Sequence, residues 1–425
     1  MFLNKNKEQY LNWIDYIIPG YFLISLVECY IGHWHLNVFI KVLGILLSVL
    51  LLCKTRVCNS KIVVITKIFM VYLLLTILMY AFNGRPVSLV SDDFMNMLPA
   101  MLFVWVGASD SRSDAPFYKK FLVYGGIIFA VGLICYLGNV DWYMSRMAEA
   151  RNRLAYINAD VYDADSIWAS LRFCSFFSDS YQVSHFATWG LGMALFFVSS
   201  VKRFKWDYVV LVVFTLACFL SQHRVAIAAG SAALLFFFCY KRVYTSLRFV
   251  FIFVFFVIIF VGAYMYLNTN YSEQMSILSD NLIGRLDEMS YSKAMEGSRN
   301  DKTARLMQDF DSIVFGEGLG CASPTAARYG LSCVTDGAFI KLLFETGYVG
   351  LMFFLCIVFI SIMRGLRHFK YLFVDLFVIS FTLAAMIGSN TLTMGYLLTI
   401  PFWYALGHIW NNEYLDKAIK DNVKI

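Results

Sequence analysis

Residues 338–363 of the chain read AFIKLLFETGYVGLMFFLCIVFISIM. The run contains only two charged residues, Lys341 and Glu345, whose spacing of four places them on one face of a helix, where they can pair. About 20 consecutive apolar residues are enough to cross the hydrocarbon core of a bilayer as a helix. This stretch therefore predicts a transmembrane helix and sets the expected fold class, a helical membrane protein.

The composition of the whole chain agrees with this class. Of its 425 residues, 60% are apolar and 15% are charged, and the mean hydropathy is +0.64, whereas soluble domains are about one quarter charged. The apolar runs predict about twelve transmembrane helices in a single all-α integral-membrane domain that covers residues 1–425. The predicted spans are 14–32, 36–53, 62–82, 93–109, 119–138, 181–201, 207–221, 225–240, 249–267, 338–363, 371–388 and 392–411.

The loops between these runs alternate in charge, which predicts the topology. One set is short and basic, as in Lys202-Arg203-Phe204-Lys205, and both terminal segments are also rich in lysine. Because basic loops are retained in the cytoplasm, we expect this set and both termini on the cytoplasmic side of a bacterial inner membrane. The other set of loops then faces the periplasm.

The periplasmic side carries the only two long segments between predicted spans, residues 139–180 and 268–337. We expect these two large periplasmic loops to build the functional site, because long structured loops on one face of a protein commonly do so. The net charge of +6 is spread over many short loops and does not predict nucleic-acid binding. The spacing of Cys and His residues predicts no metal site.

Arginines on the periplasmic side are the first candidates for a site. Arg172 precedes the span 181–201, and Arg224 lies in the turn Ser221-Gln222-His223-Arg224 before the span 225–240. Arginine in this position runs against the usual charge distribution, and a planar guanidinium suits a diphosphate because it forms paired hydrogen bonds. The alternative is that each side chain reaches lipid head groups or pairs with a nearby acid.

Two further arginines lie in the second long segment, beside a predicted helix. Leu306, Phe310 and Ile313 repeat at helical spacing. At about 100° per residue, Arg299 projects onto this apolar stripe and Arg305 onto the opposite face. Arg299 would also lie in the first turn, where free backbone N–H groups favour an anion. We therefore expect Arg299 to face a ligand and Arg305 to be solvated.

An acid at the membrane surface is the candidate catalytic base. The alternating glycines of Phe315-Gly316-Glu317-Gly318-Leu319-Gly320 predict a tight turn, and Asp336 follows it at the start of the span 338–363. The alternative is that Asp336 caps this helix. Glu345 should lie about two turns deeper, where an acid is either functional or paired. His185 and His223 are further secondary candidates, although a lone histidine is more often simply hydrogen-bonded.

Three stretches together resemble the superfamily of O-antigen polymerases and O-antigen ligases. Its C-terminal signature is similar to Ser298-Arg299, the glycine turn 315–320, and the run from Asp336-Gly337-Ala338-Phe339 to Gly350. Residues 172–180 resemble the family's segment that enters the membrane after the first long loop, and the turn that ends at Arg224 resembles its Ser-x-x-Arg turn. Ligases tend to carry His-Asn where this chain has Asp336-Gly337, so the resemblance favours the polymerases.

The resemblance implies a GT-C-like, metal-independent glycosyltransferase that needs no cofactor. It would polymerise repeat units linked to undecaprenyl diphosphate at the periplasmic face during lipopolysaccharide biosynthesis, among membrane lipids and with a chain-length regulator protein as a partner. The residues that would bind the diphosphate are Arg172, Arg224, Arg299 and Arg305, the last because ten residues separate it from Gly316, as in polymerase loops. The residues expected to carry catalysis are Asp336, Arg299 and Arg224.

Two alternatives remain from the sequence. One is an O-antigen ligase that transfers the polysaccharide to lipid A-core. The other is a flippase or other transporter of lipid-linked oligosaccharides, which should show repeat symmetry and polar residues near the middle of the membrane. Neither feature is evident here, and the length of the chain outside the spans is concentrated in two loops on one side.

Overall fold

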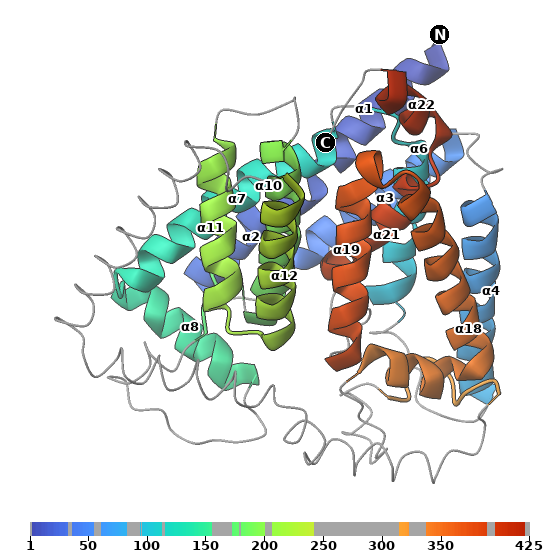
Figure 1. The fold of residues 1–425 in the computed structure, drawn as a ribbon. Coiled ribbons are helices and arrows are strands. Elements are labelled where there is room, and N and C mark those ends of the chain that lie inside the picture. The colour runs from blue at the N-terminus through green and yellow to red at the C-terminus, as the bar shows by residue number, and fades with distance from the viewer. Residues whose placement is uncertain are drawn as a thin grey trace.

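The computed structural model describes residues 2–32, 36–54, 61–82, 94, 96–112, 115–154, 172–177, 180–199, 206–241, 314–322, 337–388 and 396–420. Every regular element within these ranges is a helix (Figure 1). The helices are α1 (Phe2–Ile14), α2 (Ile17–Ile31), α3 (Asn37–Lys54), α4 (Lys61–Phe82), α6 (Phe103–Ser109), α7 (Pro116–Leu137), α8 (Asp141–Leu154), α10 (Ser180–Ser199), α11 (Asp207–Leu220), α12 (Arg224–Lys241), α18 (Ala338–Arg367), α19 (Phe369–Gly388), α21 (Tyr396–His408) and α22 (Asn412–Lys420).

Several of the described helices have the length and apolar character of membrane spans. Five stretches are long and apolar enough to cross a membrane: Lys7–Ile31, Lys61–Leu78, Pro116–Leu137, Ala338–Arg367 and Phe369–Ile387. Large apolar side chains are exposed on the outside of α3, α4 and α18, as expected for surfaces that face lipid. The chain is therefore a helical membrane protein, which confirms the expected class. Each predicted span overlaps a helix except 249–267, which lies outside the described residues.

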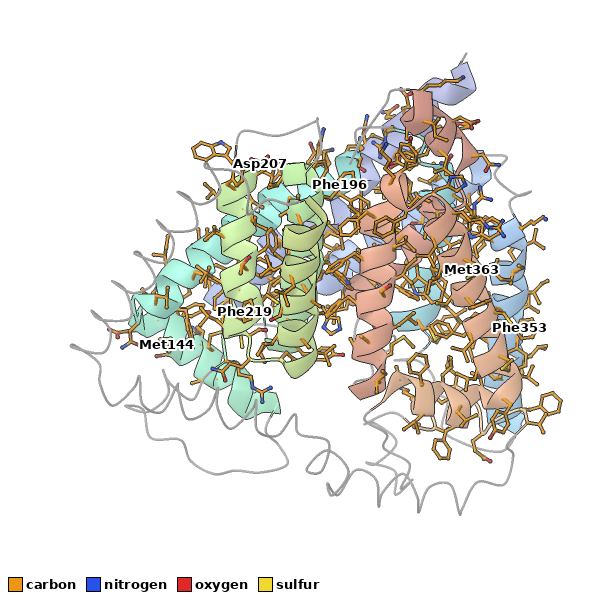
Figure 2. All side chains as sticks on the ribbon, in the orientation of Figure 1. Met144, Phe196, Asp207, Phe219, Phe353 and Met363 are labelled. Carbon is orange, nitrogen blue, oxygen red and sulfur yellow. The ribbon has the colours of Figure 1, made fainter. Side chains whose placement is uncertain are left out.

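Aromatic rings hold the helices together in a shared core. Phe22 of α2 packs against Phe186 of α10 with ring centroids 5.3 Å apart, and Phe214 of α11 packs against Phe129 of α7 at 5.3 Å. Phe121 of α7 bridges these pairs, 5.4 Å from Phe22 and 6.2 Å from Phe214. Figure 2 shows such side chains filling the space between the ribbons. Ring pairs at these separations add to the free energy gained from burying their area.

The directions of the helices define two ends of the molecule. At one end α10, α12 and α18 begin and α19 finishes; we call it the Arg224 end (Figure 1). At the other, α7 begins and α18 finishes close to α1 and α22; we call it the Lys417 end. Basic residues, among them Lys119, Arg367 and Lys417, gather at the Lys417 end, which agrees with the loop-charge pattern.

The predicted span 338–363 needs a correction, because α18 is broken. Gly347 has φ +66° and ψ −173°, far from helical values. Figure 1 shows the first part of α18, from Ala338, lying across the Arg224 end, while the remainder rises beside α4. Glu345 therefore lies at the break rather than two turns down a straight helix. Glycine allows this because it has no Cβ and tolerates a positive φ.

Besides α1, which meets the predicted span 14–32 only at Ile14, two described helices have no counterpart among the predicted elements. Helix α8 lies in the segment 139–180, which was predicted only as a long loop, and α22 follows the last span. Both are too polar for a hydropathy-based prediction, yet each buries one face. Helix α8 buries Tyr143, Met144 and Met147, and α22 buries Tyr414, Leu415 and Ala418.

Candidate functional site

A pocket at the Arg224 end lies between α10, α12 and α19. It holds approximately 220 Å³ of empty space, including its opening. Two of its lining residues, His185 and His223, are secondary candidates from the sequence. The lining residues are Tyr181, Ser184, His185, His223, Val225, Ala226, Phe381 and Ala385.

His185 presents one nitrogen that has no hydrogen-bond partner among the described residues. Its Nδ1 lies 3.0 Å from the carbonyl oxygen of Tyr181, one turn earlier on α10. A carbonyl oxygen only accepts, so Nδ1 carries the hydrogen and Nε2 keeps a free lone pair. Within the part of the chain that the structure describes, the buried Nε2 makes no hydrogen bond. The pocket therefore contains a buried acceptor for a ligand that can donate.

Aromatic rings surround this histidine. The ring of Tyr181 lies 4.3 Å from that of His185 and 4.8 Å from that of His223, measured between centroids. The ring of Phe381, on α19, lies 5.3 Å from that of His185. The hydroxyl of Ser184 donates to the carbonyl oxygen of Tyr181 at 2.7 Å and is therefore already engaged. The walls thus combine apolar ring faces with the open acceptor of His185.

A backbone hydrogen bond brings the chain after Arg172 to the last turn of α11, just before the turn that leads to Arg224 at the edge of this pocket. The N–H of Phe173 donates to the carbonyl oxygen of Leu220 at 3.0 Å, which binds the segment after Arg172 to the last turn of α11. Helix α12 begins at Arg224, immediately before the lining residue Val225. The two positions are distant in sequence, yet the fold places both chain segments at the same helix ends. The first turn of α12 adds backbone N–H groups that favour an anion.

The position of Asp336 lies outside the described residues, as do those of Arg299 and Arg305, but the chain next to Asp336 can be followed. Gly337 immediately precedes α18. It packs on the end of α19, as shown by a Cβ atom built on it, which would lie 2.9 Å from the carbonyl oxygen of Ile387. The preceding turn of α19 carries Ala385, which lines the pocket. The described chain therefore brings Gly337 to the end of α19, next to the turn that lines the pocket.

Glu345 binds the glycine turn. Its Oε1 accepts hydrogen bonds from the backbone N–H groups of Gly320 and Ala322 at 3.1 and 3.3 Å. The Nζ of Lys341 lies 3.7 Å from the same oxygen, and both side chains are buried. The sequence predicted that Glu345 is either functional or paired. The contact with Lys341 is the paired arrangement. These contacts describe a carboxylate that holds backbone in place.

The glycine turn also closes the break in α18. The N–H of Glu317 donates to the carbonyl oxygen of Phe344 at 2.8 Å, and that of Gly318 donates to the carbonyl oxygen of Glu345 at 3.0 Å. The hydroxyl of Tyr72 on α4 donates to the carbonyl oxygen of Thr346 at 2.5 Å. The carbonyl groups that the break would expose are thus satisfied, as a buried helix end requires.

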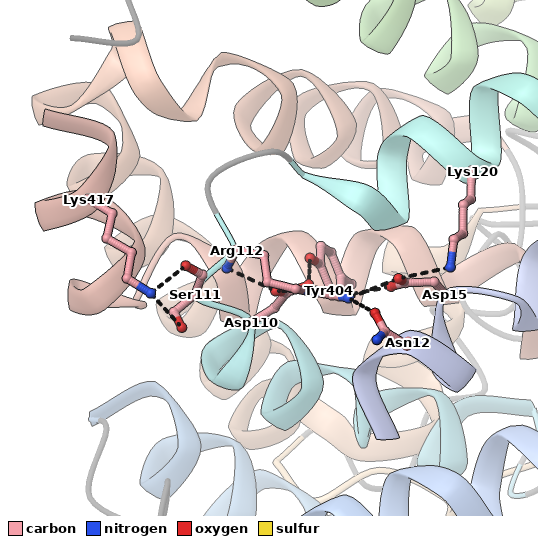
Figure 3. Close-up of polar contacts among 8 residues, drawn as sticks. All are labelled: Asn12, Asp15, Asp110, Ser111, Arg112, Lys120, Tyr404 and Lys417. Carbon is pink, nitrogen blue, oxygen red and sulfur yellow. Dashed lines mark hydrogen bonds and ion pairs between the residues drawn. The ribbon is translucent and has the colours of Figure 1, made fainter. Parts of the chain in front are cut away.

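A buried ion cluster stabilises the Lys417 end (Figure 3). Arg112 donates two hydrogen bonds to Asp15, both at 2.9 Å, and two to Asp110, at 2.7 and 2.6 Å. The Tyr404 hydroxyl donates to Asp110 at 2.9 Å, and Lys120 lies 3.4 Å from Asp15. Burial alone would raise the pKa of Asp110, but the hydrogen bonds and charge of Arg112 outweigh it and hold that pKa below its ordinary value.

A second buried cluster lies nearby. The carboxylate of Asp375 accepts a hydrogen bond from the Tyr118 hydroxyl at 2.5 Å and lies 3.0 Å from Nδ1 of His408. The sequence interpretation did not single out Asp15, Asp110 or Asp375. A signal was available, because acids within or beside apolar runs are costly and are usually paired or functional. In both clusters the polar atoms named here are partnered, which fits a role in joining helices.

Comparison with profiles of known protein families finds no match to this sequence. Comparison with curated protein sequences likewise finds no similar protein. Within the described ranges, no group of three or more His, Cys, Asp and Glu side chains is placed to hold a metal ion.

Proposed function

We propose that the chain is an inner-membrane polymerase of O-antigen or a related surface polysaccharide. It would move a growing glycan from undecaprenyl diphosphate onto the terminal sugar of a second lipid-linked repeat unit. The single observation that carries the proposal is the convergence at the Arg224 end. The chain segments of Arg172 and Arg224 meet there beside the His185 pocket. The resemblance of the glycine turn and residues 336–350 to the polymerase signature supports the same reaction.

The proposed reaction requires a base and positively charged groups. The acceptor hydroxyl gives its proton to the carboxylate of Asp336 while its oxygen bonds to the anomeric carbon of the donor. The bond from that carbon to the diphosphate oxygen breaks, and the diphosphate keeps the electron pair. Arg172 and Arg224 would stabilise the charge that develops on this leaving group. Arg299 and Arg305 belong to the same proposed set on sequence grounds.

The proposal includes a GT-C-like fold of about twelve spans. It also includes a topology in which the Arg224 end faces the periplasm and both termini lie in the cytoplasm. The basic residues near the end of α18 and in α22 support this orientation, since positive charge is retained inside. Lipid-linked glycans occupy the outer leaflet once they have been flipped, so the proposed site would meet its substrates there.

Deletion of the gene tests the proposal through the surface glycan. A polymerase predicts core carrying a single repeat unit, and the ladder should return with the wild-type chain or Arg367→Ala but not with Arg224→Ala. Asp336→Asn keeps a helix cap but removes the base, so it should not restore the ladder. Polymer accumulating on the lipid carrier would instead identify a ligase, and an unchanged ladder in the deletion strain would contradict the proposal.

A further inference from the structure

We propose that α8 lies on the surface of the lipid bilayer, with its outward face among the phospholipid head groups. Tyr30 and Trp142 would mark the boundary between these head groups and the acyl chains. The partner is thus the membrane interface, a zone of phosphate groups and water. The inference goes beyond the proposed function and does not depend on it, because it concerns a contact with lipid and assigns no catalytic role.

Helix α8 has one buried and one outward face, and it lies obliquely to α11 and α12 (Figure 1). The buried face is apolar and consists of Tyr143, Met144 and Met147. Helix α8 contacts α2 and α7, so its apolar face is already covered by protein. At about 100° per residue, the other face is mainly polar and suits head groups better than acyl chains. The residues on this outward face are Trp142, Ser145, Arg146 and Glu149.

Exposed side chains next to α8 change from apolar to aromatic to charged. Ile134, in the last turn of α7, is 70% exposed. Tyr30, near the end of α2, is 71% exposed, and its ring lies 6.0 Å from that of Trp142, which is 41% exposed. One turn further along α8, Arg146 pairs with Glu149 at 2.9 Å. Proteins show this order where they leave the acyl chains, because tyrosine and tryptophan concentrate at the level of the head groups.

The charge of Arg146 complements the phosphate groups of lipids. Among the described residues, its guanidinium donates from Nη1 to Glu149, and the side chain is 39% exposed. Because a guanidinium carries five N–H groups, others remain for phosphate oxygens. Water could also hydrate Arg146 and Glu149, but it gives no reason for an exposed aromatic pair at the edge of an apolar surface. The bilayer interface accounts for both features.

The aromatic pair is also connected to the candidate site. The ring of Trp142 stacks on that of Phe176, with centroids 6.4 Å apart and planes 9° apart. Phe176 belongs to the segment that Phe173 binds to the last turn of α11. Placing Trp142 at the interface would therefore set the depth of this segment in the membrane. For the proposed polymerase, the diphosphate of a lipid-linked substrate lies at this same level.

Spin labels measure the depth of α8 in the membrane. Ile134→Cys, Ser145→Cys and Lys417→Cys reporters are introduced singly into the full-length chain with its native cysteines replaced. The chains are reconstituted in vesicles of phosphatidylethanolamine and phosphatidylglycerol, where oxygen collides with labels among the acyl chains and a nickel chelate with labels in water. We expect the Ser145 label to meet less oxygen than the Ile134 label and less chelate than the Lys417 label.

Three results would overturn the inference. Chelate access at Ser145 equal to that at Lys417 would place α8 in water, and oxygen access equal to that at Ile134 would place it among the acyl chains. Low access to both would show that protein covers the outward face.

A second measurement keeps the native cysteines, in case the chain without them does not fold. The fluorescence of the wild type and of Trp142→Phe is compared in vesicles that contain brominated lipids, so that the difference between the two chains isolates Trp142. Bromine near the head group should quench this difference more than bromine near the ends of the acyl chains. The reverse order, or no quenching, would equally contradict the proposed position of α8.

Discussion

Gly316 and Gly347 meet backbone to backbone where the glycine turn enters the break in α18. Both have positive φ, +79° and +66°, and a Cβ atom built on Gly316 would lie 2.5 Å from the backbone nitrogen of Gly347. No side chain larger than hydrogen fits between them. The two glycines therefore fix the course of the chain that connects the second long segment to α18.

Alanine at either glycine should destabilise the protein. Gly316→Ala and Gly347→Ala each add a methyl group where backbone atoms already touch, and both require a strained positive φ. We expect the apparent melting temperature in detergent to fall by about 5 °C or more. Gly126→Ala in α7 is the control, because its Cβ would meet side-chain atoms rather than backbone, with a methyl group of Val210 at 3.3 Å as the nearest. Equal melting temperatures for all three variants would contradict the proposed contact.

The buried pair of Lys341 and Glu345 should be strongly coupled. Glu345→Ala removes the acceptor for two backbone N–H groups together with a counter-charge for Lys341, and breaking a buried pair typically costs about 3–5 kcal/mol. Replacing both residues, as in Lys341→Met with Glu345→Ala, should cost less than the sum of these two single changes. The measurement is a double-mutant cycle of unfolding free energies in detergent micelles. Additive costs would show that the two side chains do not interact.

Arg112 and Lys417 both contact residues near the Lys417 end but should differ greatly in their effect on stability. Arg112→Ala leaves the carboxylates of Asp15 and Asp110 buried without their main partner, at a cost of about 3–5 kcal/mol. Among the described residues, Lys417 makes exposed contacts with Ser111, at 3.3 and 3.5 Å, so Lys417→Ala should change stability by less than about 0.5 kcal/mol. Denaturant unfolding of both variants measures the difference. Similar values for the two would refute the role of the cluster.

The orientation of the two ends can be tested by labelling. Single reporter cysteines, Asp141→Cys at the start of α8 and Lys417→Cys in α22, are introduced into a chain whose native cysteines have been replaced. Both positions are exposed. A membrane-impermeant maleimide should label the Asp141 reporter in intact spheroplasts and the Lys417 reporter only after lysis. The reverse pattern would place the Arg224 end in the cytoplasm and remove the proposed site from its substrates.

Sequence alone predicted the positions of most of the described helices but not the break in α18. Long apolar runs determine helix position because the bilayer core admits only a satisfied backbone. The sequence at Gly347 did not indicate a break, since glycine is common in membrane helices. Its positive φ is set by a contact with Gly316, far upstream. Helix α8 was missed because its apolar residues form one face and not a continuous run.

The candidate site was predictable residue by residue but not as an assembly. His185 and His223 stand out individually as histidines at the start of a span and in a turn. Tyr181 and Phe381 gave no signal, because aromatic residues occur throughout the spans. Helices α10 and α19 are joined only by tertiary packing, so their shared pocket is visible only in three dimensions. Proposed roles for Arg299, Arg305 and Asp336 still depend on the sequence.

Polymerisation by the purified chain tests the proposed function most directly. The wild-type protein, in nanodiscs, is incubated with repeat units linked to undecaprenyl diphosphate from its own strain, and products are separated by size. We predict a ladder of lengthening lipid-linked glycans from the wild type and from Arg367→Ala. Arg224→Ala should give none, and Arg224→Lys little, because an ammonium group cannot form the paired hydrogen bonds of a guanidinium. Absence of a ladder from the wild type, or an undiminished ladder from Arg224→Ala, would contradict the proposal.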